Sequence, residues 1–382
     1  MLHTLDLVII LLAYNKINQR CAMINFQTPI NSLGYGVAGY NIFKEIIKIH
    51  PSAALYPIST PEFTDEYIEK GLKNRLKLLA FPSVRMWHQN DVHTQIGKGE
   101  HIGFPIFELT EFSEEEKLSM SHCDRLFVCS KWAKSIVNGS NFGYYKADGR
   151  PKLPPKTHVV PLGVDTQIFK PTPSRNDDKT IFFNCGKWEV RKGHDVLIEC
   201  FNAAFEPQDN VELWMMCDNP FIGQMNEQWK NLYKNSKLGN KIKFIPRQET
   251  HEDVYNIMRR VDCGVFPARA EGWNLELLEM MACGKQVIAT NYSAHTEFCN
   301  DSNSHLIEMP EREKAYDGVF FDGSKGEWAK FGNFEKETLI DHMRFNHFLK
   351  PASQKQNEQG IITASKFTWE NSAKELLNGL KL

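Results

Sequence analysis

Two glutamates in the stretch EGWNLELLE have the type and spacing to bind a phosphorylated sugar ligand. The stretch lies between the strand-like CGVFPARA and a segment of helical composition, so Asn274 is the predicted N-cap of a helix. Free N–H groups at a helix start favour a diphosphate, and Gly272 lets the backbone approach it. Sugar hydroxyls would then lie near Glu271 in the loop, and ribose hydroxyls near Glu279 in the helix. The alternative is a loop carboxylate and a solvated helix residue.

A basic loop supplies the counter-charge that a diphosphate needs. In GKWEVRKGHDVLIECF, the cations Lys187, Arg191 and Lys192 follow a predicted strand and precede Gly193 and a helix. Cations beside a helix start can bind a phosphate pair, although an isolated basic loop is usually only solvated. The loop's place at the carboxyl end of a strand favours binding, because ligands of open α/β sheets bind there.

A glycine-bearing segment, NSLGYGVAG, forms a predicted strand-to-helix turn in the first half of the chain. Gly34, Gly36 and Gly39 have the spacing of a dinucleotide-binding turn, but PIST stands where an acidic residue is expected about twenty positions later. We interpret the turn as a place where phosphate or sugar approaches the backbone. A plain tight turn is the alternative.

Two further segments carry polar residues after predicted strands. RMWHQNDVH places Trp87 and His88 together, and an aromatic ring beside hydrogen-bonding groups suits a sugar platform; an ordinary surface loop is the alternative. NYSAHTEF presents Ser293, His295 and Glu297 either to a ligand or as a cap for the next helix, and we favour the cap.

Alternating strand-like and helical segments position all of these residues. The predicted strands are 22–29, 53–59, 76–82, 103–109, 125–130 and 158–163 in the first half, and 180–186, 211–217, 241–246, 263–268 and 286–290 in the second. Such alternation predicts parallel sheets covered by helices on both faces. Ser130 and Gly139 are expected to begin and end one helix, and Thr250 with Asp253 forms a capping pattern before another.

A proline-rich, polar stretch, VDTQIFKPTPSRNDDKT, separates the two alternating series and marks a linker. The predicted fold class is therefore α/β, with two doubly wound, Rossmann-like domains and a cleft between them. The predicted divisions are an appended N-terminal segment at 1–22, a first domain at 23–165, a second at 166–360 and an amphipathic helix at 361–382.

Composition limits the partners and the compartment. With 45 basic and 47 acidic residues, the net charge of −2 offers no global attraction to nucleic acid or to an anionic membrane. Nine scattered cysteines are typical of buried thiols in a reducing compartment. The apolar run 7–13 falls far short of the roughly 20 residues of a membrane-spanning helix. We expect a cytoplasmic protein without a transmembrane segment, and peripheral membrane association stays open.

Four motifs in a fixed order resemble the retaining glycosyltransferases of family four, which have the GT-B fold. They are VVPLGVDTQIFKP, GKWEVRKG, EGWNLELLEMMACGKQVIAT and FTWENSAKEL, and the likeness covers most of residues 23–382. The resemblance implies sugar transfer with retention at the anomeric carbon. It also implies a nucleoside-diphosphate sugar as co-substrate, a UDP-sugar for preference, and neither a metal nor a prosthetic group.

The resemblance assigns roles to individual residues. Glu271 would contact the donor sugar and Glu279 the ribose, while Lys192, with Lys187 in the usual place of an arginine, would neutralise the diphosphate. The implied donor-binding residues are Gly34, Tyr35, Gly36, Lys187, Lys192, Arg247, Glu271, Gly272, Trp273, Asn274, Leu275 and Glu279. In that set the glycine loop Gly34–Gly36 would close over the phosphates, and Arg247 would lie near the nucleobase of the donor.

Departures from the family pattern concern the sugar and the acceptor. Trp273 and Asn274 stand where another aromatic residue and a second glycine are common. A histidine often found in the first domain has no clear counterpart, and FPIFELTEFS offers Glu108 and Glu111 instead. Glu108 joins Glu271, Lys192 and Lys187 as a catalytic candidate, with a helix-terminal charge as the alternative. Glu111, Trp87 and His88 are the acceptor candidates.

The acceptor expected from these features is a glycan or a lipid-linked glycan. Three other readings stay open: transfer to modified bases of DNA, a non-catalytic nucleotide-sugar-binding protein, and an epimerase acting on the nucleotide-sugar itself. A DNA substrate would require a basic face for phosphate contacts, and the sequence pI near 6.7 does not favour one.

Overall fold

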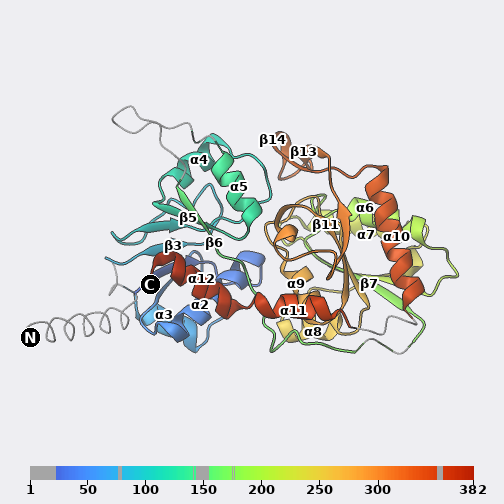
Figure 1. Ribbon diagram of the computed structural model, residues 1–382, viewed down its shortest axis with the longest axis horizontal. Coiled ribbons are helices and arrows are strands. Elements are labelled where there is room, and N and C mark those ends of the chain that lie inside the picture. Colours follow the sequence, from blue (N-terminus) through green and yellow to red (C-terminus); the bar gives the residue numbers. More distant parts are fainter. Residues whose placement is uncertain are drawn as a thin grey trace, which may run out of the picture.

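The computed structural model describes residues 23–75, 80–140, 142, 155–173, 175, 177–350 and 356–382. The described chain forms two lobes, each built around a six-stranded parallel sheet (Figure 1). The first sheet has the order β2-β1-β3-β4-β5-β6, and the second has the order β12-β11-β10-β7-β8-β9. The predicted pair of doubly wound α/β sheets is confirmed. The predicted domain limits stay predictions, and the appended segment 1–22 lies outside the described residues.

The elements of the first lobe alternate between strand and helix as expected. They are β1 (Asn25–Thr28), α2 (Gly34–Ile49), β2 (Ala54–Pro57), α3 (Glu66–Lys73), β3 (Ser83–Arg85), β4 (His101–Gly103), α4 (Glu114–Ser121), β5 (Arg125–Val128), α5 (Lys131–Gly139) and β6 (Lys156–Val159).

The second lobe repeats the pattern and adds a hairpin and three closing helices. Its elements are β7 (Thr180–Gly186), α6 (His194–Ala204), β8 (Val211–Cys217), α7 (Gly223–Lys234), η1 (Gly239–Lys241), β9 (Ile242–Phe244), α8 (His251–Met258), β10 (Cys263–Phe266), α9 (Leu275–Ala282), β11 (Gln286–Asn291), η2 (Ser293–Glu297), β12 (His305–Glu308), β13 (Arg312–Tyr316), β14 (Asp322–Ala329), α10 (Asn333–Leu349), α11 (Glu358–Lys366) and α12 (Trp369–Leu380).

Helix capping follows the sequence closely. The side chain of Ser130 accepts the Ala133 N–H at 3.1 Å, and that of Thr250 accepts the Asp253 N–H at 3.1 Å. Helix α5 ends at Gly139 as predicted, although this glycine is the last helical residue and does not have a left-handed backbone.

Two strand predictions need correction. The strand expected at 76–82 appears as β3 at Ser83–Arg85, and residues 76–79 lie outside the described chain. The strand expected at 103–109 ends at Gly103, where β4 stops. Pro105 explains the early end, because proline has no N–H to donate to a sheet ladder. The residues after Gly103 therefore form a loop.

The glycine segment is also placed differently from the prediction. Gly34, Gly36 and Gly39 lie inside the first turns of α2, after Leu33 as N-cap, and not in a turn. A Cβ at Gly39 would lie 1.7 Å from Thr28 Oγ1, and one at Gly36 would lie 2.1 Å from Asn31 Oδ1. These two glycines therefore let α2 pack closely on the end of β1.

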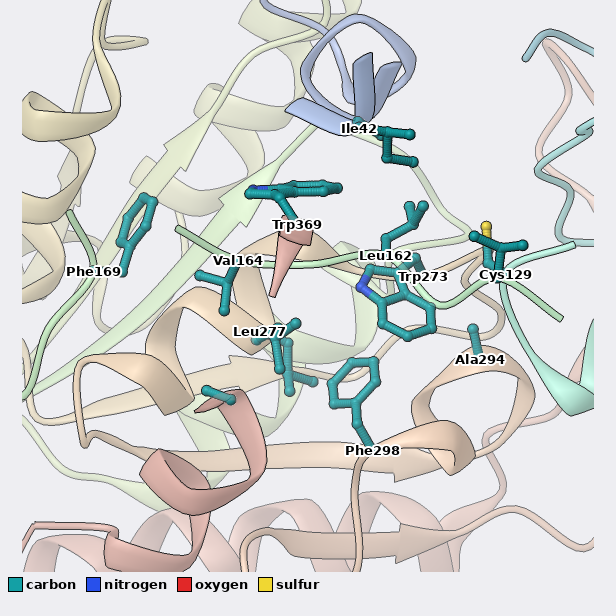
Figure 2. Close-up of a cluster of buried hydrophobic side chains, with 14 of the residues drawn as sticks. Ile42, Cys129, Leu162, Val164, Phe169, Trp273, Leu277, Ala294, Phe298 and Trp369 are labelled. Atoms are coloured by element: carbon teal, nitrogen blue, oxygen red, sulfur yellow. The ribbon is translucent and has the colours of Figure 1, made fainter. Parts of the chain in front are cut away.

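One apolar cluster runs through both lobes (Figure 2). Leu162 and Val164 belong to the segment that connects the two sheets, and they lie in this cluster with Trp273 and Trp369. Helix α12, which begins at Trp369, packs on α2 of the first lobe, so the end of the chain crosses back. The single amphipathic helix expected at 361–382 corresponds to the end of α11 followed by α12, which buries Trp369, Leu376 and Leu380. No helix among the described residues has the length and apolar character to cross a membrane.

Candidate functional site

Two loops at the carboxyl ends of neighbouring strands carry the charged residues of the candidate site. Strand β10 pairs with β7 in parallel register, so the loop after β7 lies beside the loop after β10. The first is the basic loop, residues 187–193, and the second leads through Glu271 to α9. The topology thus brings the two predicted halves of the site together.

The basic loop and Glu271 form a buried ion cluster. Lys192 Nζ lies 2.7 Å from Glu271 Oε1, and Arg191 Nη1 lies 2.8 Å from Glu271 Oε2. Glu189 accepts from Arg191 Nη2 at 2.6 Å and from Lys187 Nζ at 2.7 Å. Four of these side chains expose 11% of their surface or less, whereas Lys187 exposes 38%. Lys187 is therefore the cation that faces solvent.

Mutual attraction keeps the cluster ionised. Burial alone would raise the pKa of Glu271, but the charges of Lys192 and Arg191 outweigh burial and hold that pKa well below its usual range. Burial would lower the pKa of Lys192, and Glu271 raises it above its ordinary value instead. Burial likewise opposes ionisation of Glu189, and the charges of Arg191 and Lys187 lower its pKa.

Two glycines shape the backbone around the cations. Gly186 has a φ of +136°, and a Cβ there would lie 2.9 Å from Lys192 Cε. Gly193 has a φ of +73°, and a Cβ there would lie 1.9 Å from Pro267 O. A side chain at either position would strain the backbone and displace the loop. These glycines let Lys192 lie across the strand end and let the two loops touch.

Two side chains outside the predictions fix the basic loop. His194 Nδ1 accepts the Glu189 N–H at 3.0 Å, and its Nε2 donates to Asn184 Oδ1 at 3.0 Å. Arg269 donates to Val190 O at 2.7 Å and makes two 2.8 Å hydrogen bonds to Asp195. Nothing in the sequence pattern identified these contacts, because those of His194 depend on its rotamer and those of Arg269 on how loops distant in sequence meet.

The start of α9 is capped as predicted. Asn274 has a φ of +82°, and its Oδ1 accepts the Leu277 N–H at 3.2 Å. Its Nδ2 donates to His295 Nε2 at 2.9 Å, and His295 Nδ1 donates to Thr290 O at 3.0 Å. Burial lowers the pKa of His295 to about 4, consistent with a neutral ring in this chain of hydrogen bonds. His295 thus orients the capping residue Asn274, Ser293 Oγ accepts the Glu271 N–H at 2.8 Å, and Glu297 accepts the Lys131 N–H at the start of α5 at 2.7 Å. Among the described residues these side chains do not cap the helix that follows them, and their contact with a ligand stays a prediction.

Glu279 lies on α9 with its carboxyl group unpaired. The residue is 9% exposed, and no hydrogen bond or ion pair joins its side chain to another described residue. Burial, reinforced by the charge of Glu276, raises the pKa of Glu279 to about 8. The solvated-helix alternative is excluded, and the carboxyl group is free to accept ligand hydroxyls.

Trp273 and Leu275 contribute differently. The Trp273 side chain is 3% exposed and packs on Phe298 and Phe367, with ring centroids 5.1 and 5.7 Å away. Its indole is part of the core, which leaves its main chain for ligand contact. Leu275 begins α9, and its N–H makes no hydrogen bond within the described chain.

An aromatic group of the first lobe faces this region. Trp87 and His88 pack on Tyr35, with ring centroids 5.4 and 4.8 Å away. Tyr35 Oη donates to Ile106 O at 2.9 Å and accepts the Ile106 N–H at 2.8 Å. A Cβ on Gly272 would lie 2.4 Å from Ile106 Cγ2, so the two lobes are in close contact at this glycine. Gly272 is required here for contact between lobes.

The hairpin β13–β14 attaches the Glu108–Glu111 segment to the second lobe. Trp328 Nε1 donates to Glu108 O at 3.1 Å, and the Gly326 N–H donates to Glu111 Oε2 at 3.3 Å. Glu108 Oε1 lies 3.8 Å from Arg191 Nη1, at the edge of the ion cluster. Burial raises the pKa of Glu108, while Arg191 opposes the rise. Helix α4 begins at Glu114, six residues after Glu108, so the alternative that Glu108 is a charge at a helix N-terminus is wrong.

Arg247 also crosses between the lobes. Its Nη2 donates to Ser32 O at 2.9 Å and to Ser32 Oγ at 2.8 Å, in the loop just before Gly34 and α2. The structure therefore brings the predicted residues of both lobes to one region. Their contacts with a ligand stay predictions.

Comparison with known proteins matches part of the chain to a family model and relates its architecture to solved structures. Residues 165–318 match the family model described as Glycosyl transferases group 1. A sucrose synthase of Melioribacter roseus is 26% identical over 220 residues, which cover 54% of this chain and 25% of that protein. A probable sucrose-phosphate synthase of Thermosipho melanesiensis is 26% identical over 268 residues, covering 69% of this chain and 55% of that protein. The chain thus spans a quarter to about half of these relatives.

Solved structures resemble most of the chain, including both lobes. The sucrose-phosphate synthase of Thermosynechococcus elongatus superposes with a TM-score of 0.68 at 14% identity, covering 94% of this chain and 98% of that one. Anabaena HepE, in complex with UDP and glucose, superposes with a TM-score of 0.64 at 12% identity, covering 94% and 99%. At such identities the likeness establishes the fold alone, and that fold is GT-B.

Proposed function

We propose that this GT-B chain, whose residues 165–318 form a group 1 glycosyl transferase domain, is a retaining glycosyltransferase that uses a nucleoside-diphosphate sugar. The ion cluster carries the proposal. Lys187, Arg191 and Lys192 gather at the carboxyl edge of the second sheet, beside the start of α9, where the Leu275 N–H makes no hydrogen bond within the described chain. A diphosphate leaving group needs this arrangement of charge.

Each group in the site has a role in the proposed reaction. The cations and the α9 start stabilise the charge that develops on the diphosphate when the glycosidic bond breaks. Glu279 accepts hydrogen bonds from ribose hydroxyls, which its lack of a protein partner favours. Glu271 contacts the sugar and holds Lys192 and Arg191 in place. The departing phosphate oxygen takes the acceptor proton on the same face, which gives retention.

The acceptor side is proposed from the first lobe. The rings of Trp87, His88 and Tyr35 supply flat surfaces. Glu108 and Glu111 supply hydrogen-bond acceptors in the segment that follows Ile106, whose backbone is hydrogen-bonded to Tyr35. Aromatic faces combined with carboxylates suit the hydroxyl-rich faces of a sugar. We propose a glycan or a lipid-linked glycan as acceptor. A UDP-sugar is the proposed donor, in keeping with the UDP and glucose bound to Anabaena HepE.

The test compares donor binding and turnover in two lysine variants. Thermal-shift screening of the full chain against UDP-, GDP- and ADP-sugars identifies the donor, because a bound ligand stabilises the folded state. Release of nucleoside diphosphate from that donor is then measured for the parent and for Lys192→Met. We expect a loss of about a hundredfold or more, the scale of removing one preorganised charge contact.

Lys350→Met is the matched control. Lys350 is a buried lysine that directly follows α10, and its Nζ lies 3.0 Å from Asp177 Oδ1 and 3.1 Å from Asp262 Oδ2. Its loss costs stability without touching the ion cluster. A Lys192→Met protein as active as the parent would exclude the proposed role. Conversion of the donor sugar without diphosphate release would indicate an epimerase instead.

A further inference from the structure

We propose that Glu189 is a positioning residue that limits how tightly the site holds a nucleoside diphosphate, and so speeds its release. The proposal rests on the proposed function and adds a residue that the motif comparison leaves without a role. Glu189 stands inside the basic loop, between two of the cations expected to meet the phosphates.

The carboxylate of Glu189 joins two cations at once. Its Oε1 lies 2.7 Å from Lys187 Nζ, and its Oε2 lies 2.6 Å from Arg191 Nη2. The side chain is 4% exposed, and the Glu189 N–H is fixed by His194 Nδ1 at 3.0 Å. Both ends of this residue are therefore held, and its charge cannot simply turn out into solvent when a ligand arrives.

The charges of the free site are already balanced. Three cations, Lys187, Arg191 and Lys192, face the carboxylates of Glu189 and Glu271 at hydrogen-bond distance. Glu108 adds a third carboxyl group 3.8 Å from Arg191. An entering diphosphate brings further negative charge, so it must compete with these carboxylates for the same N–H donors.

Glu189 is the carboxylate whose presence the proposed chemistry does not otherwise require. Glu271 has the donor sugar to contact, and Glu108 faces the acceptor side. Glu189 instead orders Lys187 and Arg191 before the donor binds, which keeps two like charges from separating in the empty site. The same negative charge opposes the diphosphate that remains after transfer. Glu189 therefore both orders the two cations before the donor binds and favours release of the nucleoside diphosphate after transfer.

The test measures the affinity of UDP for the parent and for Glu189→Gln by isothermal titration calorimetry. Glutamine keeps the shape and removes the charge. We expect UDP to bind about tenfold more tightly to Glu189→Gln, the scale of one nearby like charge at a partly buried site. Uridine, which has no phosphate, should bind both proteins equally. Glu189→Asp, which keeps the charge, should bind UDP as the parent does. GDP and ADP replace UDP where the parent prefers them.

Glu212→Gln is the matched control. Glu212 also joins two lysines, Lys179 at 2.5 Å and Lys243 at 2.9 Å, but it lies near the amino end of β8, away from the site. It should leave UDP affinity unchanged. Equal or weaker UDP binding by Glu189→Gln would overturn the inference, as would equal tightening in Glu212→Gln. A parent that binds none of the three nucleotides would instead overturn the proposed function itself.

Discussion

The two glutamates of the α9 motif differ in ionisation because their neighbours differ. Glu271 accepts hydrogen bonds from Lys192 and Arg191, which hold its pKa well below the usual range. Glu279, eight residues later, has no cation beside it among the described residues, and burial raises its pKa to about 8. Glu271 is therefore a fixed negative charge, whereas Glu279 is a buried carboxyl group without a partner among the described residues.

The raised pKa of Glu279 gives a stability prediction. An unfolded chain ionises this carboxyl group near its ordinary pKa, so the folded state is disfavoured as pH rises from that value through about 8. Glu279→Gln removes this cost. We expect the variant to match the parent near pH 5 and to exceed its stability by about 2 kcal/mol at pH 9. Thermal unfolding at both pH values measures the difference.

Glu276 provides the check on this prediction. Its charge contributes to the raised pKa of Glu279, so Glu276→Gln should reduce the pH-dependent cost without removing it. A Glu279→Gln protein that differs from the parent equally at pH 5 and pH 9 would show that the effect does not come from ionisation.

At the scale of elements, the start of α9 depends on a left-handed asparagine. Asn274 supplies both the φ of +82° and the side-chain cap to Leu277. Replacement by glycine keeps the backbone conformation and should cost a few tenths of a kcal/mol, whereas alanine should cost about 2 kcal/mol through lost cap and backbone strain. Chemical denaturation of the two variants measures the difference. Equal losses would mean that the left-handed backbone is not what the position requires.

The β13–β14 hairpin gives a second prediction at this scale. Trp328→Phe removes the indole donor to Glu108 O and so loosens the acceptor-side segment. Trp214→Phe is the control, because Trp214 Nε1 donates to Glu212 on β8 at 2.8 Å, away from the site. Each change should cost about 1 kcal/mol of stability. Donor turnover should fall roughly tenfold in Trp328→Phe alone, as expected for a misplaced site residue. Equal activities would exclude a positioning role for the hairpin.

Local signals explain which elements and site residues were predictable. The cap at Asn274, the basic loop after β7 and most strands of the second sheet follow from short stretches of sequence. The pairing of Glu189 with Arg191, the hydrogen bond from Trp328 to Glu108 and the crossing of Arg247 to Ser32 join segments far apart or depend on rotamers. The glycines of α2 were misplaced because their spacing serves packing on β1 as well as it serves a turn.

At the scale of the whole molecule, the site belongs to both lobes. The connecting segment, α12 and the hairpin all join them, and Lys131 N donates to Glu297 Oε2 at 2.7 Å as a further link. Most of the predicted donor residues belong to the second lobe, whereas Gly34, Tyr35 and Gly36 belong to the first, which also carries the acceptor candidates. Sugar transfer in this account therefore requires the lobes to hold two ligands against each other, with the ion cluster taking the charge of the leaving group.

Time-resolved NMR of donor breakdown is the sharpest test of retaining transfer assisted by the ion cluster. The full chain is incubated with an α-linked donor, UDP-glucose or whichever nucleotide-sugar binds, and water serves as acceptor. We expect release of nucleoside diphosphate, first appearance of the free sugar as the α anomer, and loss of both signals in Lys192→Met. A β anomer formed first, or release that persists in Lys192→Met, would contradict that expectation.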